Sequence, residues 1–163
     1  MSLTAGAVSD SDPTQRQRFD RILLASEGRE ISDAAIRRVI ELANDGATVH
    51  VFSIARVHGV SFGMQTPGLL PTKKEWQEQR DLVAKAVKRL SRRGFTADGH
   101  VLGTRKAGKK ILEEARLHGS EAIVMTADAD RNRFVGDLLW TQEPQRVRRR
   151  ARNKLPVFLV VDE

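Results

Sequence analysis

Short apolar runs alternate with segments of helical periodicity along most of this chain, and this alternation limits the possible folds more than any other feature. Residues 22–25, Ile-Leu-Leu-Ala, form a continuous apolar run of the kind found in strands that are buried on both faces. Similar strand signals occupy residues 47–54, 95–102, 122–125 and 155–161. Helical patterns fill residues 32–43, 72–93, 104–118 and 141–153. Five strands alternating with four helices predict an α/β fold, a three-layer open parallel five-stranded sheet with helices on both faces.

The expected strand order is 3-2-1-4-5. The third strand signal is interrupted by Asp98 and Gly99, which is typical of a strand at the edge of a sheet. In open parallel sheets, ligands bind beyond the carboxyl ends of the strands, where the strand order reverses. This point would lie between strands one and four, so residues 26–29 and 126–133 are predicted to face a ligand.

The length of 163 residues suits one domain. Residues 1–17 are small and polar and are predicted to be a flexible N-terminal arm, with the folded domain spanning residues 18–163. Residues 55–71, rich in glycine and proline, are predicted to form a long loop. No apolar stretch is long enough to span a bilayer, and the start lacks the apolar segment of a signal peptide. The expectation is a cytoplasmic protein with no membrane partner.

The sequence lacks the residues that several kinds of chemistry require. There is no cysteine, which excludes disulfides, thiolate metal ligands and a cysteine nucleophile. The four histidines, at positions 50, 58, 100 and 118, show no paired metal-binding spacing, so no metal site is predicted. No acid and base pair and no hydrolase or Walker A motif stands out. The sequence therefore predicts no catalytic residue and no enzyme.

The chain is basic, with 28 Lys and Arg against 21 Asp and Glu. Six cationic side chains crowd residues 146–154 of the last predicted helix, which could contact phosphates or an acidic partner. Val147 and Ala151 would keep a buried stripe on that helix, and cations are favoured near a helix C-terminus. No aromatic residues interleave with the run. A solvated helix end is thus the favoured interpretation, and nucleic acid is not expected as a partner.

The ordered series of strands resembles the universal stress protein family. Residues 22–28, Ile-Leu-Leu-Ala-Ser-Glu-Gly, are similar to its first strand, and residues 46–51, Gly-Ala-Thr-Val-His-Val, to its second. Residues 101–103, 122–125 and 156–161 resemble the strands that follow. The resemblance implies an adenine-nucleotide α-hydrolase-like, Rossmann-like sheet. It also implies a homodimer formed through the terminal strand, whose interface residues would be Val157, Phe158, Leu159, Val160 and Val161.

Nucleotide-binding members of that family carry a G-x2-G-x9-G-[S/T] loop after the fourth strand. Here the three glycine positions hold Thr126, Ala129 and, after a one-residue insertion, Trp140, and only the hydroxyl of Thr141 remains. Glu27 stands where the family usually has Asp at the adenine end. If a nucleotide binds, the residues that would contact it are Glu27, Thr126, Ala129, Arg131, Arg133 and Thr141.

Three functional hypotheses follow from these features. The first is a non-enzymatic regulatory or stress-response protein, homodimeric, without conventional ATP binding and with a further protein partner of unknown identity. The second is an ATP-binding switch or weak ATPase, with Mg²⁺, in which Arg131 and Arg133 replace the glycine cradle. The third is a module that binds nucleic acid or an acidic partner through the basic last helix.

Overall fold

The structure is a computed structural model that describes residues 17–56, 70–127, 143–151 and 155–161. It contains five strands and four helices within those residues. In chain order they are β1 (Phe19–Ser26), α1 (Asp33–Leu42), β2 (Ala43–Arg56), α2 (Lys73–Arg92), β3 (Thr96–Thr104), α3 (Ala107–Leu117), β4 (Ala122–Ala127), α4 (Glu143–Ala151) and β5 (Val157–Val161). The predicted alternation is confirmed.

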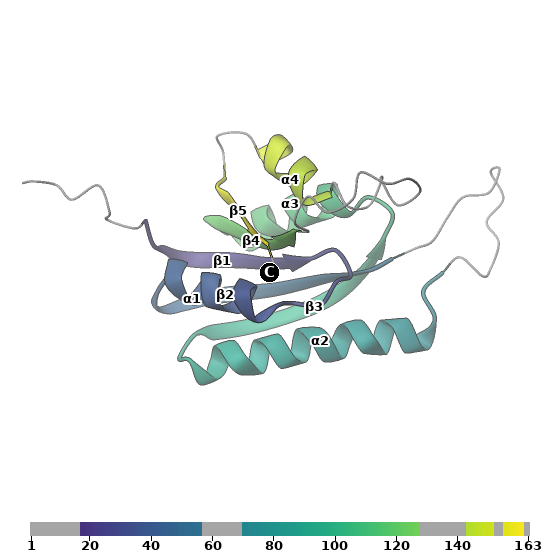
Figure 1. Ribbon diagram of the computed structural model, residues 1–163, viewed down its shortest axis with the longest axis horizontal. Helices are drawn as coiled ribbons and strands as arrows, with labels where there is room; N and C mark the ends of the chain where they lie inside the picture. Colours follow the sequence, from purple (N-terminus) through teal and green to yellow (C-terminus); the bar gives the residue numbers. More distant parts are fainter. Residues whose placement is uncertain (1–16, 57–69, 128–142, 152–154, 162–163) are drawn as a thin grey trace, which may run out of the picture.

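The five strands form one parallel sheet in the order β3-β2-β1-β4-β5, as predicted. Figure 1 shows α1 and α2 on one face of the sheet and α3 and α4 on the other. The strand order reverses between β1 and β4, which are neighbours in register from Ile22 opposite Ala122 to Ala25 opposite Met125. The carboxyl ends of these two strands therefore lie side by side.

Each face of the sheet has its own hydrophobic core. On the α1 and α2 face, Ile22 and Leu24 of β1 pack with Val49 and Val51 of β2. On the α3 and α4 face, the alternate residues Leu23 and Ala25 pack with Phe52 and Ile54. This division follows from the strand geometry, because successive side chains point to opposite faces.

The helix starts agree with the sequence patterns in two cases. The backbone N–H of Ala35 donates to the Ser32 hydroxyl, 3.1 Å away, so Ser32, the first residue of the predicted helical pattern, caps α1. Thr72 caps α2 in a full capping box with Glu75. Gly46 has a φ of 71°, a left-handed conformation that favours glycine. It lies inside β2, since α1 ends earlier than predicted, at Leu42.

Other boundaries also differ from the predictions. Strand β2 spans Ala43–Arg56 rather than residues 47–54. The third helix begins at Ala107 rather than residue 104, because Thr104 is still paired with Arg56 in the β3–β2 ladder. The fourth strand continues through Thr126 and Ala127, which pair with Val160 and Val161 of β5. Thr126 is therefore a strand residue and not the start of a loop.

Some predictions fall outside the described residues. These are the arm at residues 1–16, most of the loop at residues 55–71, and the segment that follows β4 up to residue 142. Within the described ranges, no helix has the length and apolar character needed to cross a membrane.

Candidate functional site

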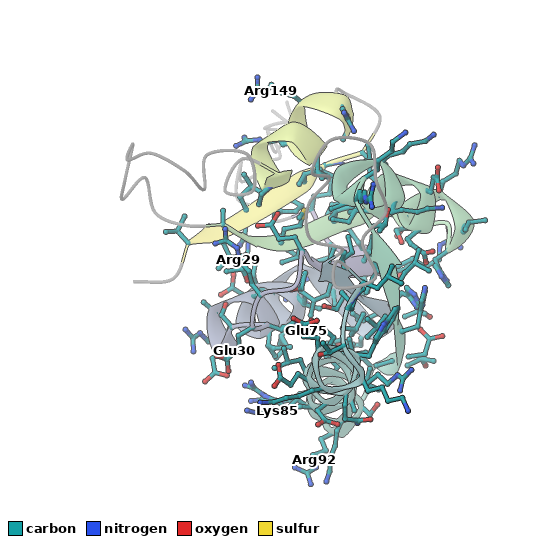
Figure 2. The ribbon with its side chains drawn as sticks, turned by 90° about the vertical axis from the view of Figure 1, so that its right-hand side faces the viewer. Arg29, Glu30, Glu75, Lys85, Arg92 and Arg149 are labelled. Carbon is teal, nitrogen blue, oxygen red and sulfur yellow. The ribbon has the colours of Figure 1, made fainter. Side chains whose placement is uncertain are left out.

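The predicted ligand edge is the carboxyl end of β1 and β4, and Figure 2 looks onto this edge. The chain leaves β1 at Ser26 and turns sharply. The Ser26 hydroxyl donates to the carbonyl of Arg29 at 2.6 Å, and Gly28 has a φ of 93° that favours glycine. This turn folds Arg29 back toward Glu27.

Glu27 is a buried acidic residue whose charge is matched from within the chain. Only 4% of it is exposed, and the Arg29 Nε lies 2.9 Å from its Oε1. An ion pair at this depth is maintained only when both charges are compensated, since an isolated buried charge is very unfavourable. The carboxylate that the family resemblance assigns to adenine is thus engaged with Arg29 in this structure.

A glutamine of α2 ties this turn to the sheet. The Ser53 hydroxyl of β2 donates to Gln79 Oε1 at 2.6 Å, and Gln79 Nε2 donates to the Gly28 carbonyl at 3.2 Å. Beside it lies a surface hollow of about 380 Å³, at the lower end of the size range of small-molecule sites. Its lining residues are Gly28, Arg29, Ile54, Ala55, Glu75, Glu78 and Gln79. Figure 2 labels Arg29 and Glu75, which reach this edge from the β1 turn and from the first turn of α2.

Thr126 is the other predicted nucleotide contact that the structure describes. Its hydroxyl lies 3.5 Å from the hydroxyl of Ser32, the N-cap of α1. A side chain therefore occupies the position between β4 and the start of α1 where the family pattern has a glycine. The structure brings Glu27 and Thr126 to the same edge of the sheet, whereas Ala129, Arg131, Arg133 and Thr141 lie outside the described residues.

The predicted dimer strand, β5, contributes side chains to both faces of the sheet. Phe158 and Val160 pack with the core under α1, while Val157 and Leu159 pack with the core under α3 and α4. Val161 is 46% exposed. In the described part of the chain β5 pairs with β4 alone, so it is an edge strand.

The basic last helix has the solvated character that its pattern predicts. Val147 and Ala151 are buried, and Arg148, Arg149 and Arg150 are exposed. In Figure 2, Arg149 points away from the body of the molecule, on the side remote from Lys85 and Arg92 of α2.

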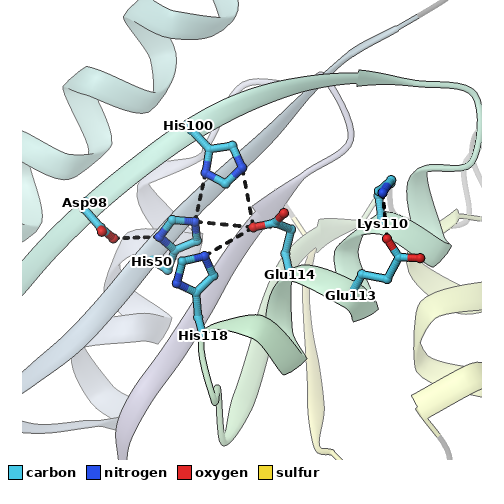
Figure 3. Close-up of polar contacts among 7 residues, drawn as sticks. All are labelled: His50, Asp98, His100, Lys110, Glu113, Glu114 and His118. Atoms are coloured by element: carbon cyan, nitrogen blue, oxygen red, sulfur yellow. Dashed lines mark hydrogen bonds and ion pairs between the residues drawn. The ribbon is translucent and has the colours of Figure 1, made fainter.

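A polar group that the sequence analysis missed lies elsewhere, between the sheet and α3. It consists of His50 of β2, Asp98 and His100 of β3, and Glu114 and His118 at the end of α3, and we call it the histidine cluster (Figure 3). Its members come from three elements. Only the Glu114 and His118 pair has a recognisable spacing, four residues apart on one helix face.

His50 is held in one orientation within this cluster. Its Nδ1 lies 2.6 Å from Asp98 Oδ1, and its ring stacks on that of His118 with centroids 3.6 Å apart. Burial lowers the pKa of His50, and the hydrogen bond to Asp98 acts against this shift. The imidazole is therefore favoured in its neutral form, with Nδ1–H donating to the carboxylate and Nε2 left as an acceptor.

Comparisons with known proteins agree with this architecture. The profile of the universal stress protein family matches residues 18–160. No curated protein sequence matches the chain. A universal stress family protein from Burkholderia pseudomallei is similar in structure, with a TM-score of 0.60, 21% identity, and coverage of 86% of this chain and 95% of that one.

Two structures of universal stress protein from Archaeoglobus fulgidus are also similar. The first has a TM-score of 0.59 and 17% identity, and covers 87% of this chain and 93% of that one. The second, a complex with dAMP, has a TM-score of 0.55 and 16% identity, with 85% and 95% covered. The fold, its strand order and the profile match over residues 18–160 together establish that this chain belongs to the universal stress protein family.

Proposed function

We propose that this protein is a non-enzymatic, homodimeric regulator of the universal stress type that does not bind ATP in the conventional way. The observation that carries this proposal is the ion pair between Glu27 and Arg29. The acidic group expected at the adenine end is 4% exposed and already engaged with a cation of the same chain. An adenine amino group would have to compete with that cation for the same oxygens.

The sequence from Thr126 onward supports the same conclusion. Glycines at the family positions let the backbone approach a phosphate chain, and here Thr126, Ala129 and Trp140 replace them. The Thr126 side chain contacts the α1 cap. Asp128, Asp130 and Glu143 add carboxylates to this stretch of sequence. One carboxylate about 5 Å from a phosphate charge costs roughly 3 kcal/mol at an effective dielectric of 20.

Calorimetric titration with ATP and Mg²⁺ tests the absence of conventional binding. We expect no saturable heat up to millimolar ATP from the wild-type protein. The triple variant T126G/A129G/W140G, which restores the glycines, should gain measurable binding. Titration with dAMP belongs in the same series, because a relative from Archaeoglobus fulgidus was solved with that nucleotide.

Saturable micromolar ATP binding by the wild type would contradict the proposal. If the variant R131A/R133A then lost that binding, the alternative of an ATP-binding switch with an arginine cradle would replace it. A steady ATPase rate that disappears in the same variant would further argue for the weak ATPase.

The homodimer is proposed to form through the outer edge of β5. The backbone N–H of Ile123 in β4 donates to the Pro156 carbonyl at 3.0 Å. In a parallel pair, alternate residues of a strand direct their N–H and C=O groups at the same neighbour, so this bond shows which residues of β5 face β4. By that alternation, the polar backbone groups of Val157, Leu159 and Val161 point away from β4. An apolar edge strand with free backbone groups is a template for pairing with a second copy.

Light scattering after size exclusion tests the dimer. We expect a dimer for the wild type and a monomer for Val161→Pro, which removes an outward N–H without removing a bond to β4. Leu70→Pro is the control, since Leu70 is also an apolar, exposed residue but lies before α2. Truncation after Pro156 should give monomer or aggregate. A dimer that survives both changes to β5 would contradict this interface.

A further inference from the structure

Three imidazole rings surround one carboxylate oxygen in the histidine cluster. Glu114 Oε2 lies 3.3 Å from His118 Nε2, 3.4 Å from His100 Nε2 and 3.7 Å from His50 Nε2. These contacts are the dashed lines that meet at Glu114 in Figure 3. The ligand atoms of His50, Glu114 and His118 all lie within 4.8 Å of one another.

We propose that the histidine cluster is a binding site for a divalent transition metal of the zinc class. His50, Glu114 and His118 supply the ligands, and His100 supplies a fourth. The site lies between the sheet and α3, apart from the nucleotide edge, so the inference does not depend on the proposed function.

The distances from the Glu114 carboxylate to the three histidines match the ligand spacing of tetrahedral coordination. Zinc binds histidine nitrogen and carboxylate oxygen at about 2.0–2.2 Å, which places neighbouring tetrahedral ligands roughly 3.4 Å apart. The three distances from Glu114 Oε2 to the histidine Nε2 atoms, 3.3 to 3.7 Å, bracket that value. His100 Nδ1 lies within hydrogen-bond distance of His50 Nε2, 3.1 Å away, the His50 and His118 rings are stacked, and the His100 and His118 centroids are 6.5 Å apart. The three imidazoles must therefore rotate for their Nε2 atoms to face one ion, and His100 joins the site as the fourth ligand through this movement.

The state of Glu114 gives a second, independent reason for a cation. Glu114 is 8% exposed, and among the described residues its Oε2 has no hydrogen-bond partner. A buried carboxylate oxygen without a partner carries a large desolvation penalty, and buried polar atoms of this kind are rare in folded proteins. A metal ion at the centre of the cluster would compensate this charge.

Asp98 supplies the orienting contact that metal-bound histidines usually have. A ligand histidine typically donates its second ring N–H to a carboxylate, which fixes the tautomer and makes the other nitrogen a better ligand. Asp98 accepts from His50 Nδ1 at 2.6 Å and leaves Nε2 as an acceptor, 3.1 Å from His100 Nδ1 and 3.7 Å from Glu114 Oε2. Asp98 is 72% exposed and His100 is half exposed, so the cluster has an approach from solvent along the β3 edge.

The ligand types narrow the identity of the metal. Imidazole suits Zn²⁺, Co²⁺, Ni²⁺ and Cu²⁺, whereas Ca²⁺ and Mg²⁺ prefer sites built from oxygen alone. Three imidazoles and one carboxylate in a compact arrangement favour tetrahedral zinc, for which Co²⁺ is a spectroscopic substitute.

The test is a competition titration of the full-length, tag-free chain with ZnCl₂ against a chromophoric chelator. We expect one Zn²⁺ per chain. With CoCl₂ we expect the intense visible absorption of tetrahedral Co²⁺, which a loosely bound hexa-aqua ion does not give. Zinc should displace the cobalt and abolish that absorption.

Variants locate the metal. His118→Gln and Glu114→Gln should each lower zinc affinity at least 100-fold, and His100→Gln about 10-fold. Asp98 orients His50 but does not contact the metal, so Asp98→Asn should lower zinc affinity by about 10- to 100-fold and keep the tetrahedral cobalt spectrum. His58→Gln, which changes the one histidine outside the cluster, should leave affinity unchanged. Far-UV circular dichroism of each variant without metal verifies that it is folded.

Two outcomes would overturn the proposal. The first is failure of the folded wild type to bind zinc in competition with the chelator. The second is stoichiometric binding that persists in the double variant E114Q/H118Q, since the metal would then lie elsewhere. Neither outcome alters the ATP or dimer tests, so failure of this inference is distinguishable from failure of the proposed function.

Discussion

Two buried glutamates of this protein stand in opposite situations. Glu27, at the carboxyl edge of the sheet, is 4% exposed and lies 2.9 Å from an arginine of its own chain. Glu114, in the histidine cluster between the sheet and α3, is 8% exposed and faces three imidazoles. A buried carboxylate beside a guanidinium has its charge compensated within the chain, whereas one among histidines is suited to a cation from outside. The carboxylate at the expected ligand edge is therefore compensated by its own chain, and the histidine cluster is the site for which we propose a ligand.

Removing Arg29 from beside Glu27 should produce the largest loss of stability. Arg29→Ala leaves the Glu27 charge buried without its arginine, and we expect a loss of about 3 kcal/mol in the free energy of unfolding, measured by urea denaturation. Adding Glu27→Gln should recover part of this loss. Lys110→Ala is the control, since it breaks the exposed pair with Glu113 and should cost far less than Arg29→Ala. Equal losses of stability in Arg29→Ala and Lys110→Ala would show that the buried Glu27–Arg29 pair matters no more than an exposed one.

Supplying a cation to the second glutamate should stabilise the protein by a similar amount. At a free zinc concentration 100 times the dissociation constant, mass action gives about 2.7 kcal/mol. For a chain of this size that raises the midpoint of thermal unfolding by roughly 5–10 °C. Glu114→Gln should show no such rise. A zinc-induced shift that is equal in both proteins would show that the stabilisation arises outside the cluster.

The alignment of β2 with β3 is what places Asp98 beside His50, and Gly99 permits that alignment. A Cβ at Gly99 would lie 2.7 Å from Val83 Cγ1 and closer still to the Val51 carbonyl oxygen. We expect Gly99→Ala to cost about 2 kcal/mol, as overpacked substitutions do, and to weaken zinc binding as β3 shifts. Gly103→Ala is the control, because its Cβ would lie 3.1 Å from the Trp76 ring and 3.9 Å from the Ala55 carbonyl oxygen, farther than the contacts at Gly99. An unchanged zinc affinity in a destabilised Gly99→Ala protein would separate the cluster from the β3 alignment.

The smallest effect should come from neutralising Glu114 without metal. Glu114→Gln replaces a buried charge with an amide that can donate to a histidine nitrogen, so we expect a change within about 0.5 kcal/mol or a slight gain. Urea denaturation in the presence of a chelator measures it. A loss comparable to that of Arg29→Ala would mean that the Glu114 charge is already well compensated by its neighbours.

The fold was accessible from the sequence because its signals are local. The apolar runs of β1 and β4, and the cap at Ser32, each depend on residues a few positions apart. Boundaries were wrong where pairing between strands decided them, as at Thr104 and Thr126. A strand end depends on its neighbour, which local patterns do not encode.

The sites divide in the same way. Glu27 could be placed at the carboxyl edge because the strand order fixes which ends meet. The histidine cluster could not be predicted, because His50, His100 and His118 come from three elements and meet only through the β2–β3 register and the position of α3. The spacing of Glu114 and His118 was visible, but pairs four residues apart are common on helix surfaces.

Strand β2 carries residues of both regions, His50 in the histidine cluster and Ser53 at the glutamine that supports the β1 turn. Side chains alternate between faces, so a slip of one residue would turn His50 into the apolar core beside α2 and bring Val49 or Val51 under α3. Insertions and deletions inside this strand would therefore damage two distant regions in one step. Over evolutionary time the length of β2 between these two residues is expected to be among the least variable features of the chain, even where the loops on either side change freely.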